Sequence, residues 1–324
     1  MPWYALDSVS DAFDESKALL FPFDLKRWVV LAVITFFVGG SGGAPQFNQT
    51  FGQPSQGDVP SSFPIQDFWL LLIGFIALLV VIGLILLILG SIMEFVFVDA
   101  LRSRDVRIRG PFGDNLGAGL RLAGFRFALF LGMLLVFAMV LGPVYAAIVM
   151  GTPVALLALV VLLPLAIVLG LTIAVIQDFT TAFVVALVGE RGGGIVGTWR
   201  QDLWPTVRAA WQQFLLYIVV KWGLGLAVGL AVGIALTLVF LPVLLLVGVG
   251  LFTGGATPAI IAVGVVLALV LFVLVQLFVN MPITVFLRYY SLSVLDKSEL
   301  DWALHPSEPE TDPVGDGSAD DPAA

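Results

Sequence analysis

Residues 127–177 read FALFLGMLLVFAMVLGPVYAAIVM, then GT, then PVALLALVVLLPLAIVLGLTIAVIQ, and they contain no charged side chain. Gly151 and Thr152 divide this stretch into two apolar runs, Phe127–Met150 and Pro153–Gln177. Each run exceeds the roughly 20 residues that an α-helix needs to cross the hydrocarbon core of a bilayer. The stretch therefore predicts two membrane-spanning helices joined by a short connection.

Four further charge-free apolar runs occur along the chain. They are Trp28 to about Ala44, Phe68–Met93, Trp222 to about Phe252, and Pro258–Leu287. Of the 324 residues, 60% are hydrophobic and 12% are charged, and the mean hydropathy is +1.06. Soluble domains carry about 25% charged residues. Because only helices and closed barrels satisfy the backbone in lipid, and barrel-like alternation is absent, we expect an all-α polytopic membrane protein with six transmembrane helices.

The fifteen Lys and Arg residues predict how these helices are oriented. All of them fall in four segments, 1–27, 94–126, 178–221 and 288–297, and the other three connections contain none. Lys and Arg are retained on the cytoplasmic side of a membrane. Every basic residue therefore predicts the same topology, a multi-pass protein of the cell membrane with both termini in the cytoplasm.

A weak internal repeat accompanies the apolar runs. A shift of 87 residues places Phe112–Phe130 on Trp199–Tyr217, and a shift of 86 places Phe97 on Phe183. Repeats of this length indicate a duplicated structural unit. We therefore expect the six helices to form three parallel hairpin units, related by an axis along the membrane normal, with interfacial helices on the cytoplasmic side.

Two segments have the pattern of such interfacial helices. In the first, Ser8–Leu20, apolar residues recur at helical spacing, and in the second Trp204, Val207 and Trp211 lie on one face while the arginines lie on others. This pattern is typical of a helix in the headgroup layer, with its apolar face toward lipid. A cytoplasmic extension of the following span is the alternative.

The stretch Phe179–Gly225 contains a glycine break at 192–194 and then a tract through Trp199, Trp204, Pro205 and Tyr217. It resembles an uncharacterised family of multi-pass membrane proteins from halophilic archaea. More loosely, most of residues 1–297 are similar to bacterial six-helix membrane domains, including the membrane domain of some glycerophosphodiester phosphodiesterases. The resemblance implies a fold and a location, and it carries over no catalytic residue. A net charge of −8 also fits a halophilic source.

Composition excludes several classes of function. The chain has no cysteine and a single histidine, His305, so we expect no metal site and no cofactor. The acidic balance argues against nucleic acid as a partner. After Lys297 the chain is rich in carboxylates and has no basic residue. We therefore expect a membrane domain at 1–297 and a disordered acidic cytoplasmic tail at 298–324.

Four polar residues in or beside the apolar runs are candidates for an ion, proton or other polar site. Glu94, Asp178 and Asn280 stand near the predicted cytoplasmic ends of the second, fourth and sixth helices, and Lys221 stands beside the fifth. Counting ~1.5 Å per residue places both acids past a hydrocarbon core of ~30 Å, so they are expected at the interface. Lys221 either extends its amine to the headgroups or pairs with an acid.

Gly225, Gly229 and Gly233 recur every four residues in the fifth predicted helix. Small residues at this spacing let another helix approach closely. The pattern predicts a helix-packing face, either within the bundle or between two copies of the chain. General enrichment of glycine in membrane helices is the alternative interpretation.

These observations favour a non-catalytic integral membrane protein that organises lipid or protein partners, and its copies or another protein are possible partners beside lipid. The alternative is a small-solute or ion permease with a site near Glu94, Asp178 and Lys221. A lipid-modifying enzyme is disfavoured because no nucleophile or metal constellation accompanies the acids.

Overall fold

The computed structural model describes residues 4–42, 65–252, 258–298, 300 and 302–304. Within these ranges the chain is helical and has no strand. The main helices are α1 (Tyr4–Leu20), α2 (Leu25–Gly42), α3 (Ile65–Ser103), α4 (Arg109–Asp114), α5 (Leu116–Ile148), α6 (Leu159–Phe179), α7 (Val185–Arg191), α8 (Ile195–Thr198), α9 (Trp204–Ala209), α10 (Trp211–Phe252), α11 (Pro258–Val275) and α12 (Met281–Asp296).

A 3₁₀ turn and three π-helical segments join some of these helices. They are η1 (Pro153–Ala158), η2 (Thr180–Val184), η3 (Trp199–Leu203) and η4 (Gln276–Asn280). The 3₁₀ turn η1 precedes α6, and the π-helical segments η2, η3 and η4 lie between α6 and α7, α8 and α9, and α11 and α12. Each π-helical segment therefore continues a helix past a widened turn.

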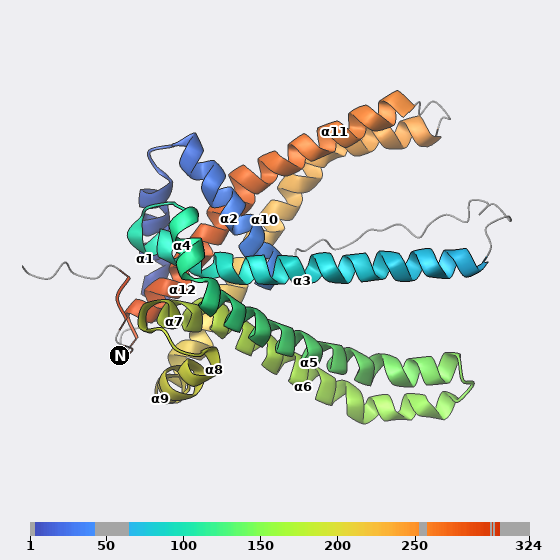
Figure 1. Ribbon diagram of the computed structural model, residues 1–324, viewed down its shortest axis with the longest axis horizontal. Helices are drawn as coiled ribbons and strands as arrows, with labels where there is room; N and C mark the ends of the chain where they lie inside the picture. Colours follow the sequence, from blue (N-terminus) through green and yellow to red (C-terminus); the bar gives the residue numbers. More distant parts are fainter. Residues whose placement is uncertain (1–3, 43–64, 253–257, 299, 301, 305–324) are drawn as a thin grey trace, which may run out of the picture.

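The helices form a base and long arms (Figure 1). Short helices, among them α1, α4, α7, α8, α9 and α12, gather at one end, and we call this end the base. From it extend α3, the packed pair α5–α6 and the packed pair α10–α11, which we call the arms. The arms diverge away from the base, so the helices pack most closely where the short helices lie.

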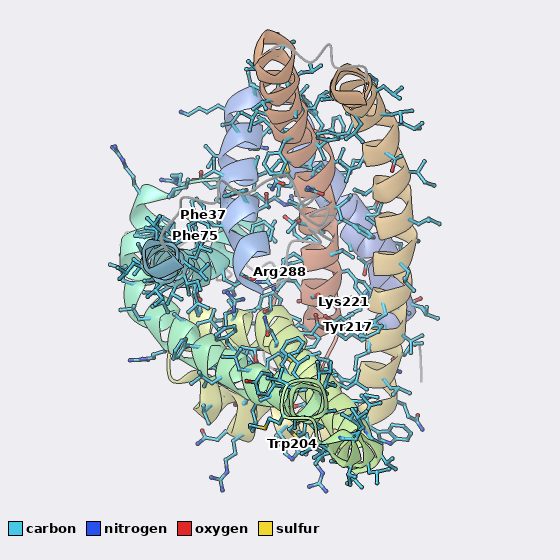
Figure 2. All side chains as sticks on the ribbon, turned by 90° about the vertical axis from the view of Figure 1, so that its right-hand side faces the viewer. Phe37, Phe75, Trp204, Tyr217, Lys221 and Arg288 are labelled. Carbon is cyan, nitrogen blue, oxygen red and sulfur yellow. The ribbon has the colours of Figure 1, made fainter. Side chains whose placement is uncertain are left out.

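Five helices of the described residues are long and apolar enough to cross a membrane. They cover Leu70–Ser103, Leu116–Ile148, Pro153–Arg191, Trp211–Leu245 and Ala262–Asp296. At most 6% of their most apolar windows is buried inside the protein. Figure 2, viewed from the tips of the arms, shows side chains directed outward around each arm. Lipid is the solvent that such surfaces require, and the chain is a multi-pass membrane protein.

The predicted apolar runs all fall on helices. Phe127–Met150 falls mainly on α5, and Trp28 to Ala44 falls mainly on α2, which packs against α3 but is not among the five spanning helices. The helices also extend past the predicted runs, and α3 continues ten residues beyond the predicted end at Met93. Glu94 therefore lies inside a helix.

The core of the protein lies in the base. Phe179, Phe183, Phe214, Tyr217 and Tyr290 are all buried and form a chain of ring contacts, with Tyr217 stacked on Tyr290 at a centroid distance of 5.6 Å. Aromatic side chains bury large areas, so this cluster contributes much of the packing energy of the base.

Helix α1 packs differently from the prediction. Its Ala5, Ser8 and Ala12 are fully buried, and α1 lies against α12 rather than only against lipid. Small side chains on one face allow this close approach. Phe13, on the same helix, is 62% exposed.

Close helix approach occurs at Gly119 and not at the predicted glycine face. A Cβ atom at Gly119 would lie 2.5 Å from Ile92 Cγ1 and 2.8 Å from Ile92 Cα, so α5 crosses α3 here only because the residue is glycine. At Gly225, Gly229 and Gly233 a Cβ would meet no atom of the described residues within 4 Å. The packing face predicted there is therefore not used within this part of the chain, and contact between copies stays a prediction.

The two aligned stretches of the sequence repeat, one at a shift of 86 residues and one at a shift of 87, differ in how similar their structural environments are. Phe97 and Phe183 are both fully buried, as the shift of 86 residues predicts. Phe214 is buried whereas Phe127 is 40% exposed. The helix that holds Phe127 runs unbroken from Leu116, while a break at Ala210 separates α9 from α10. Arg121 and Arg208 are both exposed, so the environments along the second stretch correspond only in part.

Candidate functional site

A widened helical turn prepares an acceptor for a buried arginine. In η2, the amide of Val185 donates to the carbonyl of Thr180, five residues back. In an α-helix this amide would donate to the carbonyl of Thr181. The Thr181 carbonyl instead accepts a hydrogen bond from Nη1 of Arg288 on α12. Such π-helical turns are frequent at functional sites.

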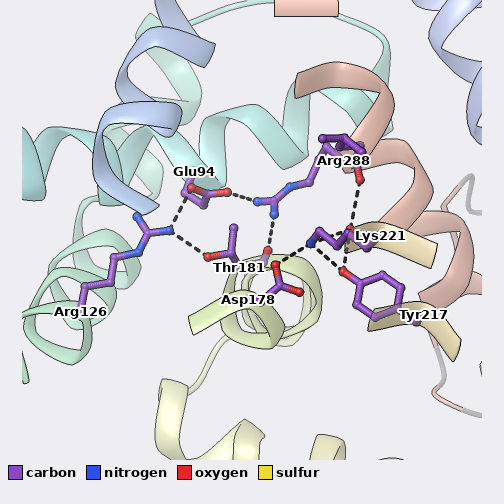
Figure 3. Close-up of polar contacts among 9 residues, drawn as sticks. Glu94, Arg126, Asp178, Thr181, Tyr217, Lys221 and Arg288 are labelled. Carbon is purple, nitrogen blue, oxygen red and sulfur yellow. Dashed lines mark hydrogen bonds and ion pairs between the residues drawn. The ribbon is translucent and has the colours of Figure 1, made fainter. Parts of the chain in front are cut away.

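Glu94 of α3 lies at the centre of the site and is fully buried (Figure 3). One of its carboxylate oxygens lies 3.0 Å from Nη2 of Arg126 on α5, and the other is paired with Nη2 of Arg288. Arg126 also donates to the hydroxyl of Thr181 at 3.2 Å. The two arginines are 3% and 6% exposed, so one carboxylate neutralises charge between two buried guanidinium groups.

A second group of polar residues lies beside the first. Lys221 of α10 donates to Oδ1 of Asp178 on α6 at 2.7 Å and to the hydroxyl of Tyr217 at 2.7 Å. The Tyr217 hydroxyl is 3.0 Å from Oγ of Ser291 on α12. The side chains of Lys221 and Asp178 are 19% and 34% exposed, so this pair lies nearer the protein surface than Glu94.

We call these residues the charged hub: Glu94, Arg126, Asp178, Thr181, Tyr217, Lys221, Arg288 and Ser291. They come from α3, α5, α6, η2, α10 and α12. Figure 2 places Arg288, Lys221 and Tyr217 among the helices near the middle of the molecule. The hub therefore connects every arm at the base.

Every charged group of the hub has a partner of opposite charge within the hub. Charge buried in a nonpolar surrounding is costly unless it is paired and hydrogen-bonded. Each carboxylate of the hub has at least one cationic partner within 3.0 Å, and each of Arg126, Lys221 and Arg288 has a carboxylate partner. With three cations and two carboxylates in their usual ionised forms, the hub carries one surplus positive charge.

Two hollows in the described part of the chain lie away from the hub. A groove of about 420 Å³ runs along α10 between Gly229 and Leu238, and a pocket of about 250 Å³ lies where α1 meets α12. Neither is lined by Glu94, Asp178 or Lys221. The hub is built as a set of mutual contacts, and these hollows do not lead to it.

Three of the four predicted polar residues come together. Glu94, Asp178 and Lys221 belong to the hub, and the structure places Lys221 on an acid rather than at the headgroups. Glu94 is fully buried among helices, and its expected depth at the membrane interface stays a prediction. Asn280 ends η4, where its amide donates to the Gln276 side chain at 3.0 Å. Among the described residues, Asn280 is hydrogen-bonded to the side chains of Gln276 and Thr284 and not to the hub.

Sequence reasoning missed Arg126 and Arg288. Both were counted among the basic residues that flank apolar runs, and therefore as markers of the cytoplasmic side. Their position next to an apolar run, at the same end as the acids, was a usable signal, because isolated charge is costly there. Thr181, Tyr217 and Ser291 carry no comparable signal in a single sequence.

The described residues contain no group of three or more His, Cys, Asp or Glu side chains suited to a metal ion. His305 and most of the predicted tail, 298–324, lie outside the described residues. Of its described residues, Trp302 and Leu304 are buried in the base, and the Arg102 guanidinium lies over the Trp302 ring at 5.6 Å.

Comparison with known proteins gives one match. A family model described as "Family of unknown function (DUF7544)" matches residues 3–304, which is most of the 324-residue chain. No curated protein and no solved structure matches the sequence.

Proposed function

Since the chain belongs to the family of unknown function DUF7544, we propose from its own residues that it is a non-catalytic protein of the cell membrane that organises lipid or protein partners. In this proposal the charged hub holds the base ends of the arms together. The arms present apolar surface to lipid, and the base presents its short helices to the cytoplasmic face.

The pairing inside the hub carries this proposal. A permeation or proton pathway needs polar groups that a solute or water can reach near the midplane. Instead, both carboxylate oxygens of Glu94 are paired with buried arginines, and the amine of Lys221 donates hydrogen bonds to Asp178 and Tyr217. Because these charged groups are paired with one another across helices, they are suited to holding the helices together.

The proposed topology extends this arrangement to six spans. Helix α2 packs against α3, as α5 packs against α6 and α10 against α11, which supports α2 as the first membrane helix and three hairpins in all. The one-sided distribution of Lys and Arg supports a cytoplasmic base with both termini inside. Halophilic origin remains a prediction from composition.

Reconstitution distinguishes this function from the permease alternative. The full chain, inserted into sealed vesicles, is expected to leave the efflux of entrapped ions and small neutral solutes at the rate of protein-free vesicles. It is also expected to retain lipid or a protein partner when it is released from its native membrane, as native mass spectrometry can measure.

The matched variant for this experiment is Lys221→Met, which removes the cation of the second group in the hub. If the wild-type protein allows solute efflux and Lys221→Met abolishes it, the proposed scaffold function is overturned and the permease alternative is supported. Unchanged efflux in both proteins, together with retained lipid or partner, is the expected result.

A further inference from the structure

The continuous helical stretch 195–209, formed by α8, η3 and α9, has one face on the core. Ile195, Thr198 and Leu203 are buried, and Val207 packs against the buried residues of the base. Trp199 donates its indole hydrogen to the Thr180 hydroxyl at 2.7 Å, directly beside the hub. This corrects two parts of the prediction: Val207 lies on the core side and not with Trp204, and the arginines lie on the same exposed face as Trp204 and not on other faces.

The opposite face carries exposed apolar and cationic groups. It consists of Val196, Arg200, Trp204 and Arg208, which recur every four residues, and we call it the cationic face. Val196 is 65% exposed and Trp204 is 52% exposed. The Arg208 guanidinium lies over the Trp204 ring at 5.9 Å. Figure 2 places Trp204 near the edge of the molecule, away from Arg288 and Lys221.

The arginines of the cationic face have no carboxylate partner among the described residues. The nearby acid Asp202 lies 3.6 Å from Arg191, and Glu190 pairs with Arg102 at 2.9 Å. No ion pair of the described residues includes Arg200 or Arg208. Although the protein as a whole has a charge of −8, this helix face carries two positive charges without a carboxylate partner among the described residues.

The cationic face is continuous with the lipid-facing surface of an arm. Only Ala210 separates α9 from α10. The exposed Trp211, Leu215 and Val219 of α10 continue the apolar surface toward the arm. At ~1.5 Å per residue the 42 residues of α10 extend about 63 Å, more than the ~40–45 Å of a bilayer with its headgroups. A helix of this length extends past the hydrocarbon core, and the end of α10 next to α9 lies at the base (Figure 1).

We infer that the cationic face docks on the headgroups of anionic phospholipids, which deepens the proposed membrane scaffold and rests on it. Guanidinium groups bind phosphate through two parallel hydrogen bonds. Tryptophan is enriched at the membrane interface because one end of its ring system is apolar and the other can donate a hydrogen bond. Arg200 and Arg208, with Trp204 between them, combine both chemistries on one face.

The test is competition between two lipids for the full chain. The protein is released from mixed micelles that hold equal amounts of phosphatidylglycerol and phosphatidylcholine, and the bound lipids are counted by native mass spectrometry at low and at high salt. Wild-type protein is expected to prefer phosphatidylglycerol at low salt. Each basic residue near the surface contributes about fivefold, so Arg200→Gln with Arg208→Gln is expected to lower the preference roughly thirtyfold.

Matched variants assign the effect to these side chains. Arg200→Lys with Arg208→Lys keeps the charge and is expected to retain most of the preference. Lys17→Gln with Lys26→Gln removes the same number of charges from α1 and α2 and is expected to leave the preference unchanged. Trp204→Ala is expected to lower binding of both lipids.

The inference is overturned if the Arg200→Gln, Arg208→Gln variant keeps the wild-type lipid preference, or if the Lys17, Lys26 variant loses it equally. Capture of a protein instead of lipid, lost in the same arginine variant, would also overturn it. Solute efflux bears on the scaffold alone, so failure of the lipid assignment leaves that separate result standing.

Discussion

Replacement of Glu94 by glutamine is expected to lower the free energy of unfolding by about 3–5 kcal/mol, the largest effect of any single substitution in the charged hub. The amide keeps the shape of the side chain but removes its negative charge. Arg126 and Arg288, 3% and 6% exposed, would then lie side by side without their shared carboxylate. The surplus charge of the hub would rise, and neither guanidinium can reach water without moving a helix.

Glu190→Gln is the matched control, because it makes the same chemical change in an ion pair at the surface. Glu190 lies 2.9 Å from Arg102, and the two side chains are 32% and 22% exposed. Surface pairs of this kind contribute about 0–1 kcal/mol. Reversible unfolding of the full chain in mixed micelles measures both variants. A Glu94→Gln protein as stable as Glu190→Gln would show that the hub does not hold the helices together.

Alanine at Gly119 is expected to cost about 1–3 kcal/mol relative to alanine at Gly117, through overpacking where α5 crosses α3. The new Cβ would lie 2.5 Å from Ile92 Cγ1 and 2.8 Å from Ile92 Cα. The side-chain atom can move, but the backbone atom moves only if α3 moves. Glu94 is two residues from Ile92, so the same displacement would disturb its pairing with Arg126.

Gly117 is a suitable control because a Cβ there would meet no described atom within 4 Å. Both substitutions gain the same helix propensity over glycine, and the comparison therefore isolates the contact with Ile92. Ile92→Ala removes Cγ1 and leaves Cα in place, so it is expected to cost less in the Gly119→Ala background than in the wild-type protein. Equal unfolding free energies for Gly119→Ala and Gly117→Ala would contradict the close crossing.

The helices of this protein could be predicted because lipid imposes a strong requirement on sequence. Phe127–Met150 and Pro153–Gln177 are long charge-free runs, and the structure contains helices over both. The end of α3 could not be placed in the same way. A charge at the end of an apolar run ordinarily marks the membrane surface, but Glu94 is neutralised by arginines from other helices, so α3 continues to Ser103.

The hub could be predicted only in part. The acids and Lys221 stand out because charge is rare in apolar segments. Their partners depend on contacts across 32 residues for Arg126 and 194 residues for Arg288, which no local pattern encodes. The role of Thr181 depends on a widened turn, and nothing in the sequence around it predicts that geometry. Gly119 was likewise hidden, because only the crossing angle of two helices makes it necessary.

The central claim is that the buried part of the hub, around Glu94 and Ser291, consists of helix-to-helix contacts closed to water, and the reactivity of one thiol tests it directly. The chain has no cysteine, so Ser291→Cys introduces a single thiol at a position that is 1% exposed and lies 3.0 Å from the Tyr217 hydroxyl. Ser10→Cys on the exposed side of α1 is the reference. A charged methanethiosulfonate reagent is expected to modify position 291 at least about a hundredfold more slowly than position 10, since the hub must open first. Modification of both positions at similar rates in the folded protein would reveal a water-filled path through the hub and would contradict the account.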